Sequence, residues 1–246
     1  MLFHLCYVMP INKIIHYIWL GNNKIDKVSS ICINSWYSNL KDYEIKQWNE
    51  KNLPIDKIKK SSKFFRDCYN KKLWAFASDY LRLYLLYEYG GIYLDTDVQV
   101  IKNFDSFLDL DFFAGLESNE FVGTGVIGAK KKSNVIKKIL DFYDNEIYFS
   151  PLCNNPMIFK YILDKNKYLL DKKNVIFQEK IFSPLSLIEE NEYPKFTNET
   201  VSIHWYNANW NFTIKGEIFL RCKNLSWYKK PYIVLRILFR RFILKK

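Results

Sequence analysis

The sequence predicts an α/β fold with a mixed, mostly parallel central sheet flanked by helices. Short β-prone runs alternate with helical patterns from Lys13 to Asp97. The first run, KIIHYIWL, is almost entirely apolar, as expected for a parallel strand that is buried on both faces. The chain of 246 residues is long enough for one large α/β domain or two small ones.

The first half of the chain gives the clearest alternation. Gly21 breaks the first strand, and Gly90-Gly91 separates a long helix from a short strand. In that helix apolar residues such as Ala77, Leu81 and Leu85 recur at helical spacing. The expected strands cover residues 13–20, 43–48 and 92–94, and the expected helices cover residues 29–40, 64–69 and 74–89.

The second half is less regular. We expect helices at 133–148 and 155–163, a strand at 175–182, a loop or short helix at 184–192 and a strand beginning at 201. Glycines 123, 125 and 128 superficially match a dinucleotide-binding fingerprint, but no clean strand precedes them, and residues 126–129 read as a strand where the fingerprint requires a helix. We therefore interpret residues 114–130 as a close-approach loop of a substrate pocket, with Glu117 and Asn119 as possible ligands for hydroxyl groups.

Most of the net charge of +11 lies at the end of the chain, because residues 221–246 hold nine Lys or Arg and no acid. The remainder is close to neutral, so no nucleic-acid partner is expected. From Pro231 onward, a helix would carry a broad apolar face beside a basic stripe. This pattern predicts contact with an anionic membrane surface, or alternatively a final helix packed on the domain. We divide the chain into a domain at 1–225 and this basic amphipathic helix at 226–246.

Five scattered cysteines without CxxC spacing argue against a disulfide framework and against a zinc site. No stretch reaches the roughly 18 apolar residues of a membrane-spanning helix, and residues 2–9 lack the features of a signal peptide. We therefore expect a cytoplasmic protein that lies peripherally at the inner face of the cell membrane.

Asp95 and Asp97 follow the short strand at 92–94 and offer oxygen ligands to a hard divalent cation. Such acidic pairs are common in solvated turns, so the surrounding residues matter. Asp79 and Arg82 share one face of the preceding helix. On an exposed helix they would form a weak ion pair, but this helix is apolar nearly all round. A buried charged pair is costly unless it is used, so we favour a functional role.

Two aromatic positions complete the candidate site. Trp19 lies at the end of the first strand and is either a core residue or a platform for a nucleotide base. Residues 201–210 end in a cluster that includes His204, Asn209 and Trp210. A cation bridging two phosphates is what transfer from a nucleotide-sugar requires, and no Walker loop favours phosphoryl transfer instead.

The segments KIIHYIWLG and ASDYLRLYLLYEYGGIYLDTD resemble a family of DXD-containing glycosyltransferases. This family includes bacterial capsule and lipopolysaccharide sugar transferases and the Golgi initiating mannosyltransferases, and is related to the glucosyltransferase domains of large clostridial toxins. The two motifs cover about 30 residues, and the strand order extends the resemblance over roughly the first 130. The resemblance implies a GT-A-like nucleotide-sugar-binding fold. It also implies a retaining transfer that depends on Mn²⁺ or Mg²⁺, with a UDP-sugar as the expected donor.

The resemblance also assigns donor-binding roles. Trp19 would stack on the base, and Tyr93 would line the ribose or sugar pocket. Asp79 and Arg82 would hold the hydroxyls of the donor sugar, and Arg82 would also reach the phosphates, which makes it a catalytic residue. Asp95 would contact the ribose or a metal-bound water.

At the metal, the resemblance makes Asp97 the direct ligand, with Asp95 beside it. Family members often end in a His-rich strand that runs into Ser-Trp, where this chain has Asn209 before Trp210. His204 and Asn209 are therefore candidate additional ligands. Trp210, like Asp97, takes a catalytic role, with its indole N–H donating to the leaving phosphate.

The predicted function is sugar transfer to a saccharide acceptor, which a lipid could carry, in cell-surface polysaccharide synthesis. Two other readings remain open. One is an inactive nucleotide-binding scaffold of a polysaccharide assembly complex, and the other is a toxin-like effector that glycosylates a protein. The sequence gives the second little support, because it shows no translocation segment.

Overall fold

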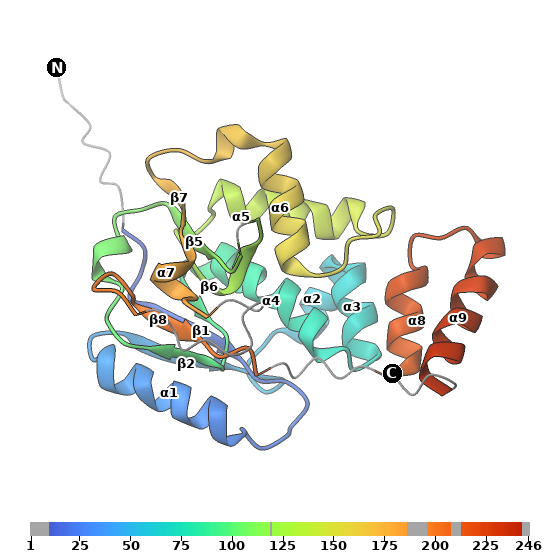
Figure 1. Ribbon diagram of the computed structural model, residues 1–246, viewed down its shortest axis with the longest axis horizontal. Helices are drawn as coiled ribbons and strands as arrows, with labels where there is room; N and C mark the ends of the chain where they lie inside the picture. The colour runs from blue at the N-terminus through green and yellow to red at the C-terminus, as the bar shows by residue number, and fades with distance from the viewer. Residues whose placement is uncertain (1–9, 119, 186–195, 208–212, 243–246) are drawn as a thin grey trace.

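The computed structural model describes residues 10–118, 120–185, 196–207 and 213–242. Its centre is a six-stranded mixed sheet in the order β2-β1-β3-β6-β5-β7 (Figure 1). β1 runs parallel to β2 and β3, β6 is antiparallel to β3 and β5, and β7 is parallel to β5. In sheet order, the strands are β2 (Glu44–Trp48), β1 (Ile14–Ile18), β3 (Gly91–Leu94), β6 (Val122–Ala129), β5 (Phe112–Leu116) and β7 (Asn174–Phe177). The predicted α/β class and mixed, mostly parallel sheet are confirmed.

Each face of this sheet carries its own hydrophobic core, because side chains of a strand alternate between the two faces. Tyr93 points into one core, while Ile92 and Leu94 point into the other. Figure 1 shows α1 on one side of the sheet and the helices α4, α5 and α6 on the other. The first six helices in the chain are α1 (Lys27–Asn39), α2 (Ile55–Ser61), α3 (Lys63–Asn70), α4 (Trp74–Tyr89), α5 (Asn134–Asp141) and α6 (Asn155–Lys165).

A second, two-stranded sheet adjoins the first and pairs distant parts of the chain. β4 (Val98–Val100) lies antiparallel to β8 (Ser202–His204), so that Val98 is opposite His204. The indole N–H of Trp36 on α1 donates to the Val98 carbonyl over 2.7 Å and holds this small sheet against the helix. The C-terminal third of the chain is thereby brought to the end of β3.

Two glycines set the direction in which the chain leaves α4. Gly90 has φ of +69° and Gly91 has φ of +104°, which L-residues rarely adopt. A Cβ at Gly90 would lie 2.6 Å from the Lys131 nitrogen, and one at Gly91 would lie 2.7 Å from the Ile14 oxygen. Glycine is therefore required at both positions, and the turn delivers β3 next to β1.

Two local predictions were wrong in part, and a third was confirmed. Residues 114–130 are mainly an antiparallel hairpin, β5–β6, and its glycines let strands pack closely: a Cβ at Gly128 would overlap the ring of Phe113. Residues 175–182 divide into β7 and the short helix α7 (Glu179–Phe182). The helix expected at 133–148 is confirmed, and it consists of α5 followed directly by a π-helical turn from Phe142 to Glu146.

The last two helices form a hairpin at one end of the molecule (Figure 1). α8 (Ile214–Cys222) was not predicted; it packs closely enough on α4's N-terminus that a Cβ at Gly216 would lie 2.3 Å from Leu73 Cδ2. α9 (Lys230–Phe242) packs on α8 mainly through the buried Ile237. Across the described residues, no helix combines the length and hydrophobicity needed to span a bilayer.

Candidate active site

Asp95 and Asp97 lie in the loop that leads from β3 of the large sheet into β4 of the small one. The Asp95 amide donates to the Gly125 carbonyl over 2.8 Å, which ties the start of the loop to β6. Pairing of β4 with β8 places His204 against the end of the loop. Ligand atoms of Asp95, Asp97 and His204 all lie within 4.8 Å of one another.

Asp97 is held by the segment that follows β8. His204 Nε2 lies 3.2 Å from one carboxylate oxygen, and the Asn207 amide donates to the other over 2.9 Å. Burial opposes ionisation of Asp97, but the hydrogen bonds from His204 and Asn207 outweigh it and lower the pKa. Burial also acts against the charged form of His204, yet the neighbouring Asp97 carboxylate raises the pKa of the imidazole.

Asp95 is anchored from beneath by Arg82 and Tyr93. Arg82 Nη1 donates to Asp95 Oδ2 over 3.0 Å and to the Thr124 carbonyl over 2.6 Å. The Tyr93 hydroxyl donates to Asp95 Oδ1 over 2.8 Å, and the Arg82 guanidinium lies 4.6 Å from the centre of the Tyr93 ring. These contacts fix the carboxylate plane while each oxygen keeps a lone pair for a further ligand.

Asp79 lies on the other side of Arg82, with 3.1 Å between Asp79 Oδ1 and Arg82 Nη2. The two residues are 1% and 5% exposed, so they are not a solvated surface pair. Asn155 Nδ2 donates to Asp79 Oδ1 over 3.2 Å and is itself oriented by the Tyr143 hydroxyl. Asp79 Oδ2 is buried and has no hydrogen-bond partner among the described residues. Burial raises the pKa of Asp79 to about 6, although Arg82 acts in the opposite direction.

A network that the sequence reasoning missed joins the acidic loop to α1. Asp26 is the N-cap of α1 and accepts from the Ser29 amide over 2.9 Å. Its carboxylate also accepts from Asn207 Nδ2 over 3.3 Å, and the Ser29 hydroxyl lies 3.3 Å from that of Thr96. The available signal was the Asp-x-x-Ser capping pattern at the start of the helix, which predicts where the helix begins but not a link to Asn207, 181 positions away.

Close backbone approach shapes the site from the β6 side. A Cβ at Gly125 would lie 3.0 Å from His204 Cε1 and 3.4 Å from Asp95 Oδ2. A Cβ at Gly123 would lie 3.1 Å from Cβ of Glu117. Burial raises the pKa of Glu117 to about 7, with the His204 charge acting against the shift. The expected close approach is therefore present, although strands provide it and not a loop.

Trp19 follows β1, whose carboxyl end lies at the same sheet edge as that of β3 because the two strands are parallel. Its indole N–H donates to the Asn23 carbonyl over 2.7 Å. The side chain lines a cavity of about 370 Å³ whose other lining residues are Asn22, Asn23, Ile25, Gln47, Asn49, Glu50 and Lys51. Trp19 is thus half-buried at a cavity, and its stacking role stays a prediction. Asn209 and Trp210 lie outside the described residues.

The side chains present fit a divalent cation. Two carboxylates and an imidazole converge within one coordination sphere, and the donor set suits a metal that accepts oxygen and nitrogen ligands. Asn207 and Arg82 orient the carboxylates from behind, as partners of metal ligands usually do. The arrangement can hold a metal cation beside the buried Arg82. The metal and the guanidinium together would bind a polyphosphate.

Comparisons with known proteins give a family match for part of the chain and two solved structures with a similar fold. Residues 26–113 match the family described as glycosyltransferase sugar-binding region containing DXD motif. The fold is similar to the PaToxG glycosyltransferase, with TM-score 0.53 and 22% identity over 67% of this chain and 72% of that one. It is also similar to a glycosyltransferase involved in glycosylation of the major capsid of PBCV-1, with TM-score 0.50 and 11% identity over 80% and 94% of the two chains. No curated protein resembles the sequence closely enough to count as a match.

Proposed function

We propose that the chain is a glycosyltransferase of the DXD-containing kind that transfers a sugar from a nucleotide-sugar to a saccharide acceptor. The family match over residues 26–113 and the GT-A-like fold support this proposal. The observation that carries the proposal is the convergence of Asp95, Asp97 and His204 next to the buried Arg82. Departure of a nucleoside diphosphate needs charge neutralisation on its phosphates. When bound, Mn²⁺ or Mg²⁺ would supply part of that neutralisation, held by Asp97 and His204 with Asp95.

Arg82 and Asp79 provide the proposed sugar-binding surface. Asp79 Oδ2 is buried and has no protein donor within the described residues, and we propose that a hydroxyl of the donor sugar becomes its partner when the donor binds. Arg82 is fixed by Asp79 and Asp95 on either side, and in this proposal its charge stabilises the departing phosphates. Trp19 would stack on the base, for which we propose uracil, and Tyr93 would line the ribose or sugar pocket. Trp210 and Asn209 are proposed to close the site at the leaving group and the metal.

We propose that the transfer retains the anomeric configuration and uses no dedicated protein base. In such a transfer the acceptor attacks from the face that the diphosphate leaves, and the departing phosphate oxygen takes the acceptor's proton. Glu117 then serves to bind hydroxyls. Its raised pKa makes it neutral over part of the physiological range, when it can donate as well as accept a hydrogen bond.

A panel of nucleotide-sugars incubated with the full chain and Mn²⁺ tests the reaction class. Release of nucleoside diphosphate from one donor, with transfer or slow hydrolysis of the sugar, is the expected result. A scaffold that merely binds nucleotides would consume none of the donors, and that outcome would reject an enzymatic role.

For the acceptor, we propose a lipid-linked saccharide of cell-surface polysaccharide synthesis at the inner face of the cell membrane. The α9 helix supports this, because Leu235, Phe239 and Phe242 are exposed beside its arginines. Such a surface fits an anionic bilayer. Deleting residues 226–246 should move the protein from the membrane to the soluble fraction without abolishing donor hydrolysis. An unchanged distribution would exclude the helix as an anchor.

A further inference from the structure

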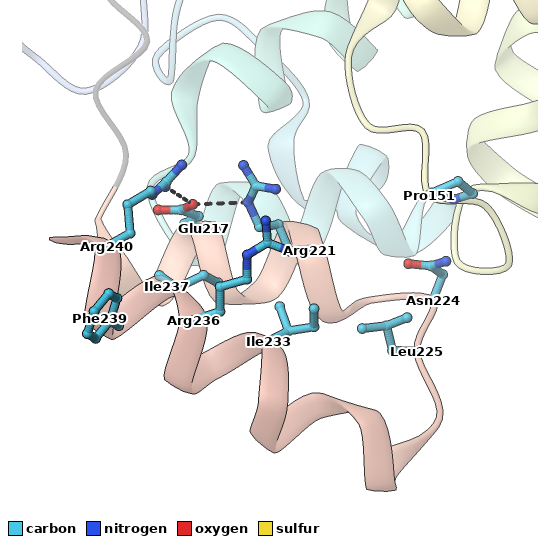
Figure 2. A pocket seen from close by; sticks show the side chains of 10 residues that line it. All are labelled: Pro151, Glu217, Arg221, Asn224, Leu225, Ile233, Arg236, Ile237, Phe239 and Arg240. Carbon is cyan, nitrogen blue, oxygen red and sulfur yellow. Dashed lines mark hydrogen bonds and ion pairs between the residues drawn. The ribbon is translucent and has the colours of Figure 1, made fainter. Parts of the chain in front are cut away.

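Helices α8 and α9 enclose a groove of about 630 Å³ that is separate from the proposed donor site (Figure 2). We call it the α8–α9 groove. One part of its lining is apolar, and the other part is charged. The apolar residues are Pro151, Leu225, Ile233, Ile237 and Phe239, and the charged residues are Glu217, Arg221, Arg236 and Arg240.

The charges in the groove are unbalanced. Glu217, which is 1% exposed, accepts hydrogen bonds from Arg221 over 3.0 Å, from Arg241 over 3.1 Å and from Arg240. The side chain of Arg236 makes no hydrogen bond or ion pair with any residue that the structure describes. Figure 2 shows its side chain extending from α9 toward Arg221 on α8. A single carboxylate therefore serves several guanidinium groups, and the groove keeps excess positive charge that favours an anion.

The chemistry of the lining selects the kind of anion. Guanidinium groups pair with phosphate through two hydrogen bonds in a fixed geometry, so Arg221 and Arg236 suit a phosphate. The apolar wall formed by Ile233 and Ile237 would gain nothing from a free phosphate or a nucleotide but would cover the glycerol and acyl part of a lipid.

The surroundings of the groove fit the same ligand. Exposed aromatic and apolar side chains lie on the same hairpin, where they would enter the interfacial region of a bilayer: Trp227, Tyr228, Tyr232, Leu235, Phe239 and Phe242. Trp227 is 82% exposed, so the residues that the structure describes leave its side chain uncovered. A lipid headgroup held in the groove would therefore have its tails directed into the membrane that these residues contact.

We propose that the α8–α9 groove binds the phosphate headgroup of an anionic membrane lipid, with Arg236 as its principal ligand. The proposal rests on the membrane docking put forward above and makes it specific. The affinity of the protein for an anionic membrane would then depend on one defined site as well as on the diffuse attraction of many cations. The same site would fix the position of the α8–α9 hairpin on the membrane. Glu217 would keep Arg221 and Arg240 in place, so that the groove is formed before the lipid arrives.

Sedimentation of the full chain with vesicles tests the site. Vesicles of phosphatidylcholine are compared with vesicles that also contain phosphatidylglycerol, for the natural chain and for the variants Arg236→Gln and Lys230→Gln. Lys230 is exposed on α9 but does not line the groove, so its substitution removes the same charge from the same helix. Loss of one surface cation lowers affinity about fivefold, whereas Arg236→Gln should lower it by a further factor of about ten.

Equal losses in the two variants would overturn the proposal, because diffuse attraction would then explain the binding. Release of the protein from vesicles by millimolar inorganic phosphate would overturn it too, since the groove would then take free phosphate. A natural chain that binds no vesicles would reject both the groove and membrane docking. Donor hydrolysis measured in parallel, without vesicles, would still report separately on the proposed sugar transfer.

Discussion

At the scale of single residues, Arg82 decides how the site is held together. Its guanidinium is 5% exposed and joins Asp79 and Asp95, which come from a helix and from the loop after a strand. Removing one residue of a buried ion-pair network leaves an unpaired charge in the interior. The resulting loss of stability is larger than the loss caused by breaking a surface ion pair. The same residue is therefore needed for the fold and, as proposed, for the leaving group.

Arg82→Met should lower the free energy of unfolding by about 3–5 kcal/mol, because it leaves the buried Asp79 carboxylate without its ion-pair partner and removes an ion pair from Asp95. Urea denaturation followed by circular dichroism measures this change. Arg66→Met is the matched control: Arg66 lies 4.0 Å from Asp67, is well exposed, and its loss should change stability by less than about 0.5 kcal/mol. Similar effects of the two substitutions would mean that the buried network is not stabilising.

His16 gives the molecule a pH dependence that is separate from the active site. The Trp48 indole donates to His16 Nδ1 over 3.0 Å, so the proton resides on Nε2, which lies 2.8 Å from the Gly90 carbonyl. Burial lowers the pKa of His16 from 6.5 to about 4. The neutral ring is thus built into the contact between β1, β2 and the turn at Gly90.

Because the unfolded chain binds this proton more readily than the folded protein, the contribution of His16 is complete above pH 6.5 and is lost as the pH falls toward 4. The loss should reach about 3 kcal/mol over that interval. The measurement is the free energy of unfolding of the natural chain and of His16→Gln across this pH range. The contribution of His16 is the difference between the two curves. Parallel curves would contradict the assignment.

At the scale of elements, the segment after β8 closes the site over the acidic loop. The backbone N–H of Asn207 donates to Asp97, and its side-chain amide donates to Asp26. Through Asn207, Asp26 therefore links the N-terminus of α1 to the metal-binding loop. Partners of this kind orient ligands without touching the metal. Their alignment depends on the pairing of β4 with β8, which brings residues more than 100 positions apart into register.

Asp26→Ser separates the two roles of Asp26. Serine is an equally good N-cap, so the free energy of unfolding should change by less than about 0.5 kcal/mol. Its side chain is too short to reach Asn207, however, and we expect Mn²⁺ affinity to fall about tenfold. Titration calorimetry with Mn²⁺ measures the second effect. Unchanged metal affinity in a folded variant would show that the link does not position Asp97.

At the scale of the whole molecule, the sequence predicted the sheet better than it predicted the closing segments. Asp79, Arg82, Tyr93 and Asp95 lie within one short stretch, and local periodicity with the Gly90-Gly91 break was enough to predict the helix and strand that carry them. The alternation of strands and helices likewise predicted that Trp19 and Asp95 end up at one sheet edge, because parallel strands share their carboxyl ends.

What the sequence did not predict depends on long-range pairing. The start of β6 was interpreted as part of a loop because glycines 123 and 125 interrupt its β-prone residues, whereas residues 126–129 were already interpreted as a strand. The packing of these glycines against Glu117, His204 and Phe113 explains them. Asn207 and Asp26 carry no local pattern that connects them. The helix α8 was missed because its polar and apolar residues give no clear stripe, and it is defined mainly by its contact with Leu73 and α9.

The central claim is that Asp97 and its neighbours hold a cation that the sugar transfer requires. Nucleoside diphosphate release from the accepted nucleotide-sugar, measured for the natural chain and for Asp97→Ala over a range of Mn²⁺ concentrations, tests it most directly. The account predicts saturable Mn²⁺ dependence for the natural chain, no activity with chelator, and at least a 100-fold loss, as an order of magnitude, in a folded Asp97→Ala variant. Full activity of that variant, or of the natural chain with the metal chelated, would contradict the account.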